Sequence, residues 1–198
     1  LIDMAFTKFK ETFDYYPKSV GAWWIDAYSL SYMREKYGIE ANLDVADQHS
    51  TDQYQVWGQY FSTPFYPSKT NALLPAASPD QKIGVVTIQW ATRDPYNGYG
   101  KGDFDSTYSI QSNDYFLHKL DSRYFEKLLD IYPEVTVGLE NDFDWQRFGG
   151  EYQKQIQILV SRQGEGKQSV LSMKDYASYY QKAYPEISPK VLISADDP

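Results

Sequence analysis

Short apolar runs alternate with stretches of helical spacing along most of this chain. Four runs are typical of strands, because each is short and rich in β-branched or aromatic residues; they occupy residues 19–25, 39–45, 83–90 and 135–139. Apolar residues at helical spacing predict helices at residues 2–13, 27–37, 113–132, 145–160 and 173–184. Two shorter apolar runs, 169–171 and 191–193, are expected as further strands.

The helix at 27–37 has the clearest end signal. Gly38 follows its last residue, where glycine readily adopts the left-handed backbone that ends a helix. Leu30 and Met33 lie about one turn apart and are expected to face the core. The glycines at 164 and 166 are expected to close the helix that begins at 145, because their spacing does not fit a phosphate-binding loop.

Alternating strands and helices predict an α/β fold with a mainly parallel sheet and helices outside it. The strands are too few for a closed eight-stranded barrel, so the sheet is either open and doubly wound or part of a barrel. The first strand leads to Asp26 instead of a glycine-rich turn, which argues against a dinucleotide fold. We predict an incomplete or distorted (β/α) barrel. Residues 1–198 would form a single α/β domain, a fragment of a larger barrel.

Composition narrows the class of partner. The 198 residues carry a net charge of -8, which argues against nucleic acid and anionic membranes as partners. No apolar run reaches the roughly 18 residues expected of a membrane span. The sequence has no Cys, so disulfides, thiolate nucleophiles and Cys-based zinc sites are excluded. Aromatic residues make up 17% of the chain, and their flat rings favour a carbohydrate partner.

Acidic side chains follow three of the predicted strands. Asp26, Asp94 and Glu140 each come after an apolar run, so all three could ring one end of the sheet, where α/β folds place their chemistry. Hydrolysis of a glycosidic bond needs two carboxylates, one protonated and one ionised. Asp26 could equally cap the helix at 27–37, and Asp142 and Asp144 are expected to cap the next helix.

The polar stretch at 46–81 is long for a loop and is expected to form a wall of the site. Within it, His49 is either a solvated histidine or a hydrogen-bond donor to substrate. Arg93 either pairs with Asp94 or binds substrate, and His118 is expected to be structural. The aromatic residues expected as sugar platforms lie near strand ends or in this stretch; they are Trp24, Trp57, Tyr60, Trp90 and Trp145.

Two segments carry a resemblance to a known superfamily. Residues 16–26 and the Lys36–Ile39 run, together with Leu139-Glu140-Asn141 and the downstream Trp145, resemble parts of the polysaccharide deacetylase and glycoside hydrolase family 57 superfamily. One segment of that superfamily has the form Gly, apolar, Trp, apolar, small or Pro, acid, which residues 21–26 approach. The resemblance implies a distorted (β/α)7 barrel and activity on polysaccharides.

The chain departs from that superfamily in its metal ligands. Its deacetylases hold a divalent metal with one Asp and two His on one early segment, whereas His49 and His118 lie far apart. We therefore expect no metal site and no cofactor in this chain. Metal-binding strands could lie in a part of the protein outside this chain, because the sequence begins inside a helical stripe with no capping residue.

Three functions stay open at this stage. The leading one is a carbohydrate-active hydrolase domain that cleaves glycosidic or N-acyl bonds of a polysaccharide with strand-end carboxylates. The second is a non-catalytic glycan-binding domain with an aromatic-lined cleft. The third is a periplasmic-type binding domain for a small ligand, although no hinge is evident. An extracellular or cell-envelope location is favoured, and the sequence does not define the oligomeric state.

Overall fold

A computed structural model describes residues 1–21, 25–45, 64–89, 117, 120–121, 134–135 and 145–189. The chain divides into two compact units. The first unit comprises Leu1–Val45, Pro64–Ile88 and Leu171–Val191; the second comprises Ala46–Thr63, Gln89–Val170 and Leu192–Pro198. A single domain over 1–198 stays a prediction. None of the described helices is long and apolar enough to cross a membrane.

Two helices of the first unit follow the sequence pattern closely. Helix α1 spans Ile2–Phe13 and ends at Asp14, whose φ is 63°. Helix α2 spans Ala27–Tyr37 and ends at Gly38, whose φ is 70°. The left-handed backbone at Gly38 confirms the predicted end signal, since residues with a Cβ rarely adopt it.

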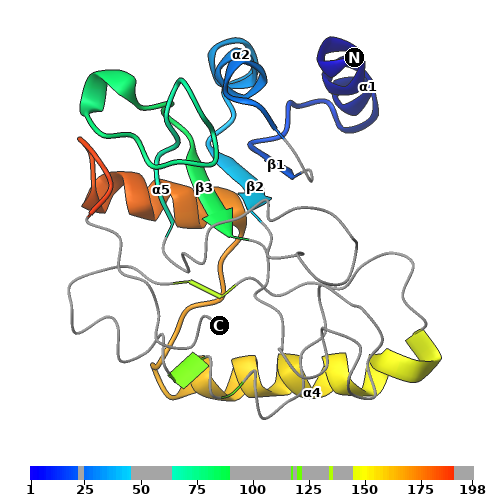
Figure 1. The fold of residues 1–198 in the computed structure, drawn as a ribbon. Helices are drawn as coiled ribbons and strands as arrows, with labels where there is room; N and C mark the ends of the chain where they lie inside the picture. Colours follow the sequence, from blue (N-terminus) through cyan, green and yellow to red (C-terminus); the bar gives the residue numbers. More distant parts are fainter. Residues whose placement is uncertain are drawn as a thin grey trace. The chain divides into compact units, whose positions relative to one another are not determined.

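The first unit contains a small parallel sheet in the order β1, β2, β3. Strand β1 spans Ser19–Gly21, β2 spans Ala41–Val45 and β3 spans Val86–Gln89. β1 and β2 pair in parallel, with Val20 opposite Asn42, and the arrows of β2 and β3 point the same way in Figure 1. The α/β class is thus confirmed, whereas the barrel stays a prediction.

The segment from Pro64 to Ser68 differs from the predicted loop. It is buried and runs antiparallel beside β3, where Phe65 and Thr87 exchange both backbone hydrogen bonds, of 3.2 and 2.8 Å. A short 3-10 helix, η1, follows at Pro79–Gln81. The described part of the expected site wall therefore contributes Phe65, Tyr66, Ala72 and Ala76 to the buried interior of the first unit.

Helix α5, at Met173–Ala183, fixes this buried segment from a distant part of the sequence. The fully buried Tyr180 donates from its hydroxyl to the carbonyl of Pro64 at 2.7 Å, and Tyr66 donates to the carbonyl of Tyr184 at 2.7 Å. The remaining core lies around α2, where Leu30 and Met33 are buried as predicted. The members of that cluster are Phe6, Ala27, Leu30, Met33, Tyr37, Ile39, Ala72, Ile83 and Val85.

The described part of the second unit is built around helix α4, at Trp145–Gly164. Leu159 packs with Leu120, and the partly buried Val135 and Ile158 cover them. Leu117, Leu120 and Asp121 are helical, as the pattern over 113–132 predicts. The strand predicted at 169–171 is wrong, because these residues have no regular structure. Of the strand predicted at 135–139, Val135 has no regular structure and the rest lies outside the described residues, as does the strand predicted at 191–193.

Candidate functional site

The carboxyl ends of the three strands define the candidate site, because the ends of parallel strands meet at one edge of a sheet. Asp26 follows β1 along the chain, His49 follows β2, and Asp94 follows β3. Asp26 and Trp145 belong to the described part of the chain. The other predicted site residues lie outside it; they are Trp24, His49, Trp57, Tyr60, Trp90, Arg93, Asp94 and Glu140.

Asp26 caps helix α2, which is the alternative that the sequence left open. Its carboxylate accepts from the backbone N–H of Ser29 at 2.9 Å and from the Ser29 hydroxyl at 2.7 Å. These hydrogen bonds to the charged form lower the pKa of Asp26 below its ordinary value. An ionised Asp26 suits a nucleophile or a base, and it does not suit a general acid near neutral pH.

The sequence analysis missed two polar side chains, which lie within the strands that lead to this edge. Asn42 of β2 and Thr87 of β3 both have an exposed fraction of 0%. Neither the amide atoms of Asn42 nor the hydroxyl of Thr87 has a hydrogen-bond partner among the described residues. Leaving such a group unpaired in the interior costs about 1–3 kcal/mol, so each needs an explanation.

These two side chains project from the same face of the sheet. The backbone N–H of Val86 donates to the carbonyl of Glu40 at 2.9 Å, and in a parallel ladder this bond sets Asn42 beside Thr87. Three adjacent atoms can thus offer a donor, an acceptor and a hydroxyl that serves as either. The only signal in the sequence was a polar residue flanked by apolar ones within each predicted strand, with Asn42 between Ala41 and Leu43 and Thr87 between Val86 and Ile88.

Trp145, the other described residue of the predicted site, opens helix α4 in the second unit. Its side chain is 52% exposed, and its ring meets that of Tyr152 edge-on at 6.2 Å. A Cβ built at Gly149 would lie 2.7 Å from the indole ring, so a larger residue there would displace the ring from this position. Trp145 therefore presents an open, supported ring surface, as a sugar platform requires.

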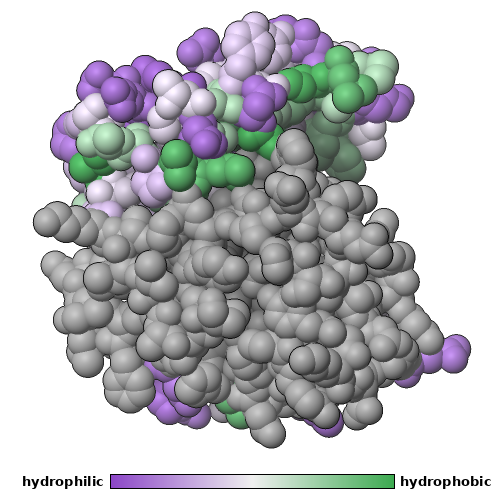
Figure 2. Space-filling view, in the orientation of Figure 1, coloured by the Kyte–Doolittle hydropathy of each residue, from purple (hydrophilic) through white to green (hydrophobic). Residues whose placement is uncertain are grey.

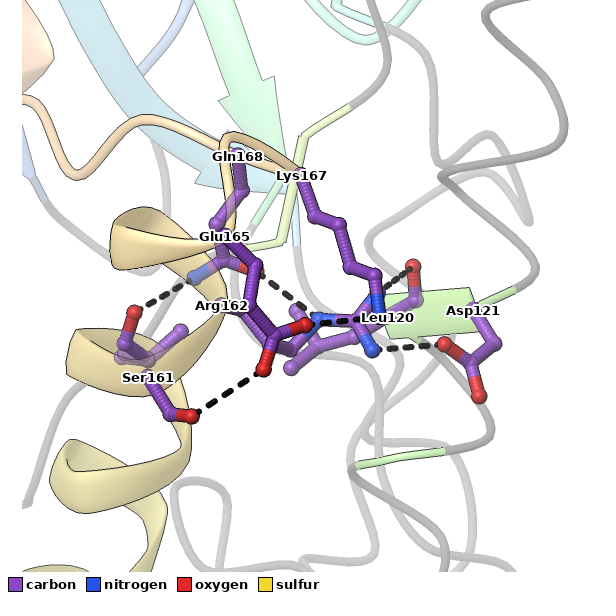
Figure 3. Close-up of polar contacts among 8 residues, drawn as sticks. Leu120, Asp121, Ser161, Arg162, Glu165, Lys167 and Gln168 are labelled. Carbon is purple, nitrogen blue, oxygen red and sulfur yellow. Dashed lines mark hydrogen bonds and ion pairs between the residues drawn. The ribbon is translucent and has the colours of Figure 1, made fainter.

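The polar cluster at the end of α4 is structural. Figure 3 shows Arg162 reaching Asp121, the Leu120 carbonyl and Gln168, at 2.6, 3.4 and 3.3 Å. Its described partners already engage every nitrogen of the Arg162 guanidinium, which leaves this group little capacity for a ligand. No three His, Cys, Asp or Glu side chains of the described ranges are grouped as a metal ion would need.

Comparison with known proteins places the chain in a family. Residues 2–187 match DUF3863, described as a domain of unknown function with a solved structure. The chain is a member of DUF3863. No curated protein matches its sequence.

The DUF3863 chain is also similar to a crystal structure from Parabacteroides distasonis, of a protein named as a candidate glycoside hydrolase/deacetylase. The TM-score is 0.60 at 16% sequence identity, which shows a shared fold. The match covers 98% of this chain and 48% of the other, so the DUF3863 chain spans about half the length of that protein.

Proposed function

We propose that this DUF3863 chain is a carbohydrate-active hydrolase domain that cleaves glycosidic or N-acyl bonds of a polysaccharide. The observation that carries the proposal is the parallel pairing of β1 and β2 with β3 next to β2, because each strand leads along the chain to a polar or acidic residue of the predicted site. The fold shared with the protein named for glycoside hydrolase/deacetylase activity supports the same class.

The roles of the carboxylates follow from their surroundings. Asp26 is held ionised by Ser29, so we assign it as the nucleophile or as the base that activates water. Glu140 or Asp94 would then be the general acid that protonates the leaving group. The exposed indole ring of Trp145 and the other predicted aromatic residues would stack on sugar rings.

The test uses the natural full-length protein and a panel of polysaccharides, with released reducing ends and released acyl groups measured separately. Glu140→Gln preserves the shape of the side chain and removes its ionisation. We expect it to lower turnover by roughly two orders of magnitude, since one general acid contributes about that much. Asp26→Asn is expected to lower turnover as well. Its effect on the stability of the fold should be small.

A matched control is Asp80→Asn, which changes an exposed acid in η1 of the first unit. It should leave turnover unchanged. Full activity in Glu140→Gln and in Asp26→Asn would contradict the roles assigned to these carboxylates, whereas no turnover of any polysaccharide by the unmodified protein would contradict the hydrolase proposal. Retained glycan binding without turnover in the unmodified protein would favour the binding-domain alternative, for which Trp145 already offers an exposed ring.

A further inference from the structure

The first unit contains an open groove at the start of β1. It has a volume of about 660 Å³ and is lined by the aromatic rings of Phe9, Tyr15, Tyr16 and Tyr37. Lys18 and Lys174 also line it, and none of its lining residues is acidic. Because Ser19 of the lining begins β1, the groove lies at the end of β1 opposite its carboxyl end.

The aromatic rings that line the groove pack against one another, and most of them remain partly exposed to solvent. Tyr15 is 60% exposed, and its ring meets that of Phe9 edge-on at 5.6 Å. The turn at Asp14, with φ of 63°, brings Tyr15 back beside α1. The space-filling view shows apolar surface exposed over α1, at the upper right of Figure 2. An exposed ring held in one orientation can stack on the apolar face of a sugar at little entropic cost.

The two lysines differ in how their charges are compensated. Lys18 lies 3.7 Å from the carboxylate of Glu40 and donates to the carbonyl of Gly38 at 3.3 Å. Lys174, in the first turn of α5, forms no ion pair with any described residue. A chain with a net charge of -8 thus places an ammonium group that has no ion pair within the described ranges beside aromatic rings, in a groove with no acidic lining residue.

We propose that this groove binds an anionic saccharide, with a sugar ring stacked on Tyr15 and its carboxylate or sulfate group paired with Lys174. Ring stacking alone would suit any sugar, and the unpaired ammonium group adds a preference for an acidic one. Tyr37 serves as a wall, because its hydroxyl already donates to Asp3. Binding in this groove involves no bond cleavage, so this proposal can be tested independently of the proposed hydrolase activity.

The test is calorimetric titration of the natural full-length protein with an oligogalacturonate, compared with a neutral oligoglucan of the same length. We expect the acidic oligosaccharide to bind more tightly and its affinity to fall as salt is added. Tyr15→Ala and Lys174→Ala should each weaken binding by about tenfold or more, whereas Lys174→Arg should retain it.

The first unit offers matched controls outside the groove. Tyr28→Ala removes a tyrosine of α2 that is 81% exposed and does not line the groove. Lys182→Ala removes another exposed lysine of α5. Neither should change the affinity. The proposal is overturned if the acidic oligosaccharide does not bind, if Tyr15→Ala and Lys174→Ala bind normally while folded, or if the controls lose as much affinity.

Discussion

The guanidinium group of Arg162 lies 2.6 Å from a carboxylate oxygen of Asp121, which comes 41 positions earlier in the chain. Arg162 is 8% exposed, whereas the side chain of Asp121 is 57% exposed. The pair joins the end of α4 to the helical residues at 120–121, where Leu120 packs on Leu159. This ion pair and the packing of Leu120 on Leu159 therefore join the same two segments.

We expect Arg162→Met to lower the free energy of unfolding of the second unit by about 2 kcal/mol, because three hydrogen bonds are lost from a buried group. Urea unfolding followed by circular dichroism measures the change. Lys167→Ala is the control, since it removes only an exposed ion pair with Glu165, and it should cost less than about 1 kcal/mol. Equal effects of the two changes would contradict a structural role for Arg162.

Thr87→Val should leave the stability of the first unit unchanged or raise it by about 1 kcal/mol. The hydroxyl of Thr87 is buried without a partner among the described residues, and valine has nearly the same shape. Thermal unfolding measures the change, with Ser29→Ala as a contrast that removes a donor to Asp26 and should destabilise. A loss of more than about 1 kcal/mol in Thr87→Val would show that the hydroxyl has a hydrogen-bonded ligand or partner.

Acid should weaken the docking of α1 on α2 through Asp3. Hydrogen bonds from Tyr37, Tyr32 and Lys36 hold the pKa of the Asp3 carboxyl well below its usual range. Since the folded state lowers this pKa, the stabilisation is complete above the ordinary pKa of about 4 and is lost as the pH falls below it. The pH dependence of unfolding below pH 5 should therefore flatten in Asp3→Asn. The control Asp14→Asn, at the exposed end of α1, should keep the slope of the unmodified protein.

Alkali should destabilise the first unit through its buried tyrosines. Burial raises the pKa of Tyr66 to about 12, and it raises the pKa of Tyr180 as well. Because these pKa values are raised on folding, their contribution is complete below the ordinary value near 10 and is lost as the pH rises through 12. Tyrosinate absorbance should show late titration accompanied by unfolding, and Tyr66→Phe should remove part of that late signal. The same change at the exposed Tyr28 should leave the alkaline unfolding unchanged.

Local signals in the sequence predict part of this fold well. Helix α2 has the predicted bounds, because a carboxylate at Asp26 and a glycine at Gly38 act on the backbone next to them. The strands are shorter than their apolar runs: β3 occupies Val86–Gln89 within the predicted 83–90. An apolar run marks a buried stretch, whereas a strand also needs a neighbour to pair with.

Non-local contacts account for what the sequence did not predict. Nothing near Phe65 indicates that it would pair with Thr87, since the pairing depends on a partner outside the segment. The burial of Asn42 likewise depends on its neighbours in space. For the candidate site, the sequence anticipated both roles of Asp26, and the structure places its carboxylate on Ser29. The catalytic roles of Asp94 and Glu140 stay predictions.

The first unit is assembled from three stretches separated along the chain, and this has a consequence for its biosynthesis. The Pro64 carbonyl accepts a hydrogen bond from the hydroxyl of Tyr180, and the backbone N–H of Tyr66 donates one to the hydroxyl of Ser188. A ribosome delivers these partners more than 100 residues later, so the N-terminal strands cannot complete their core during most of translation. A nascent chain released before α5 would carry an open sheet edge and unpaired aromatic surface, which makes the truncated product a target for chaperones and proteases.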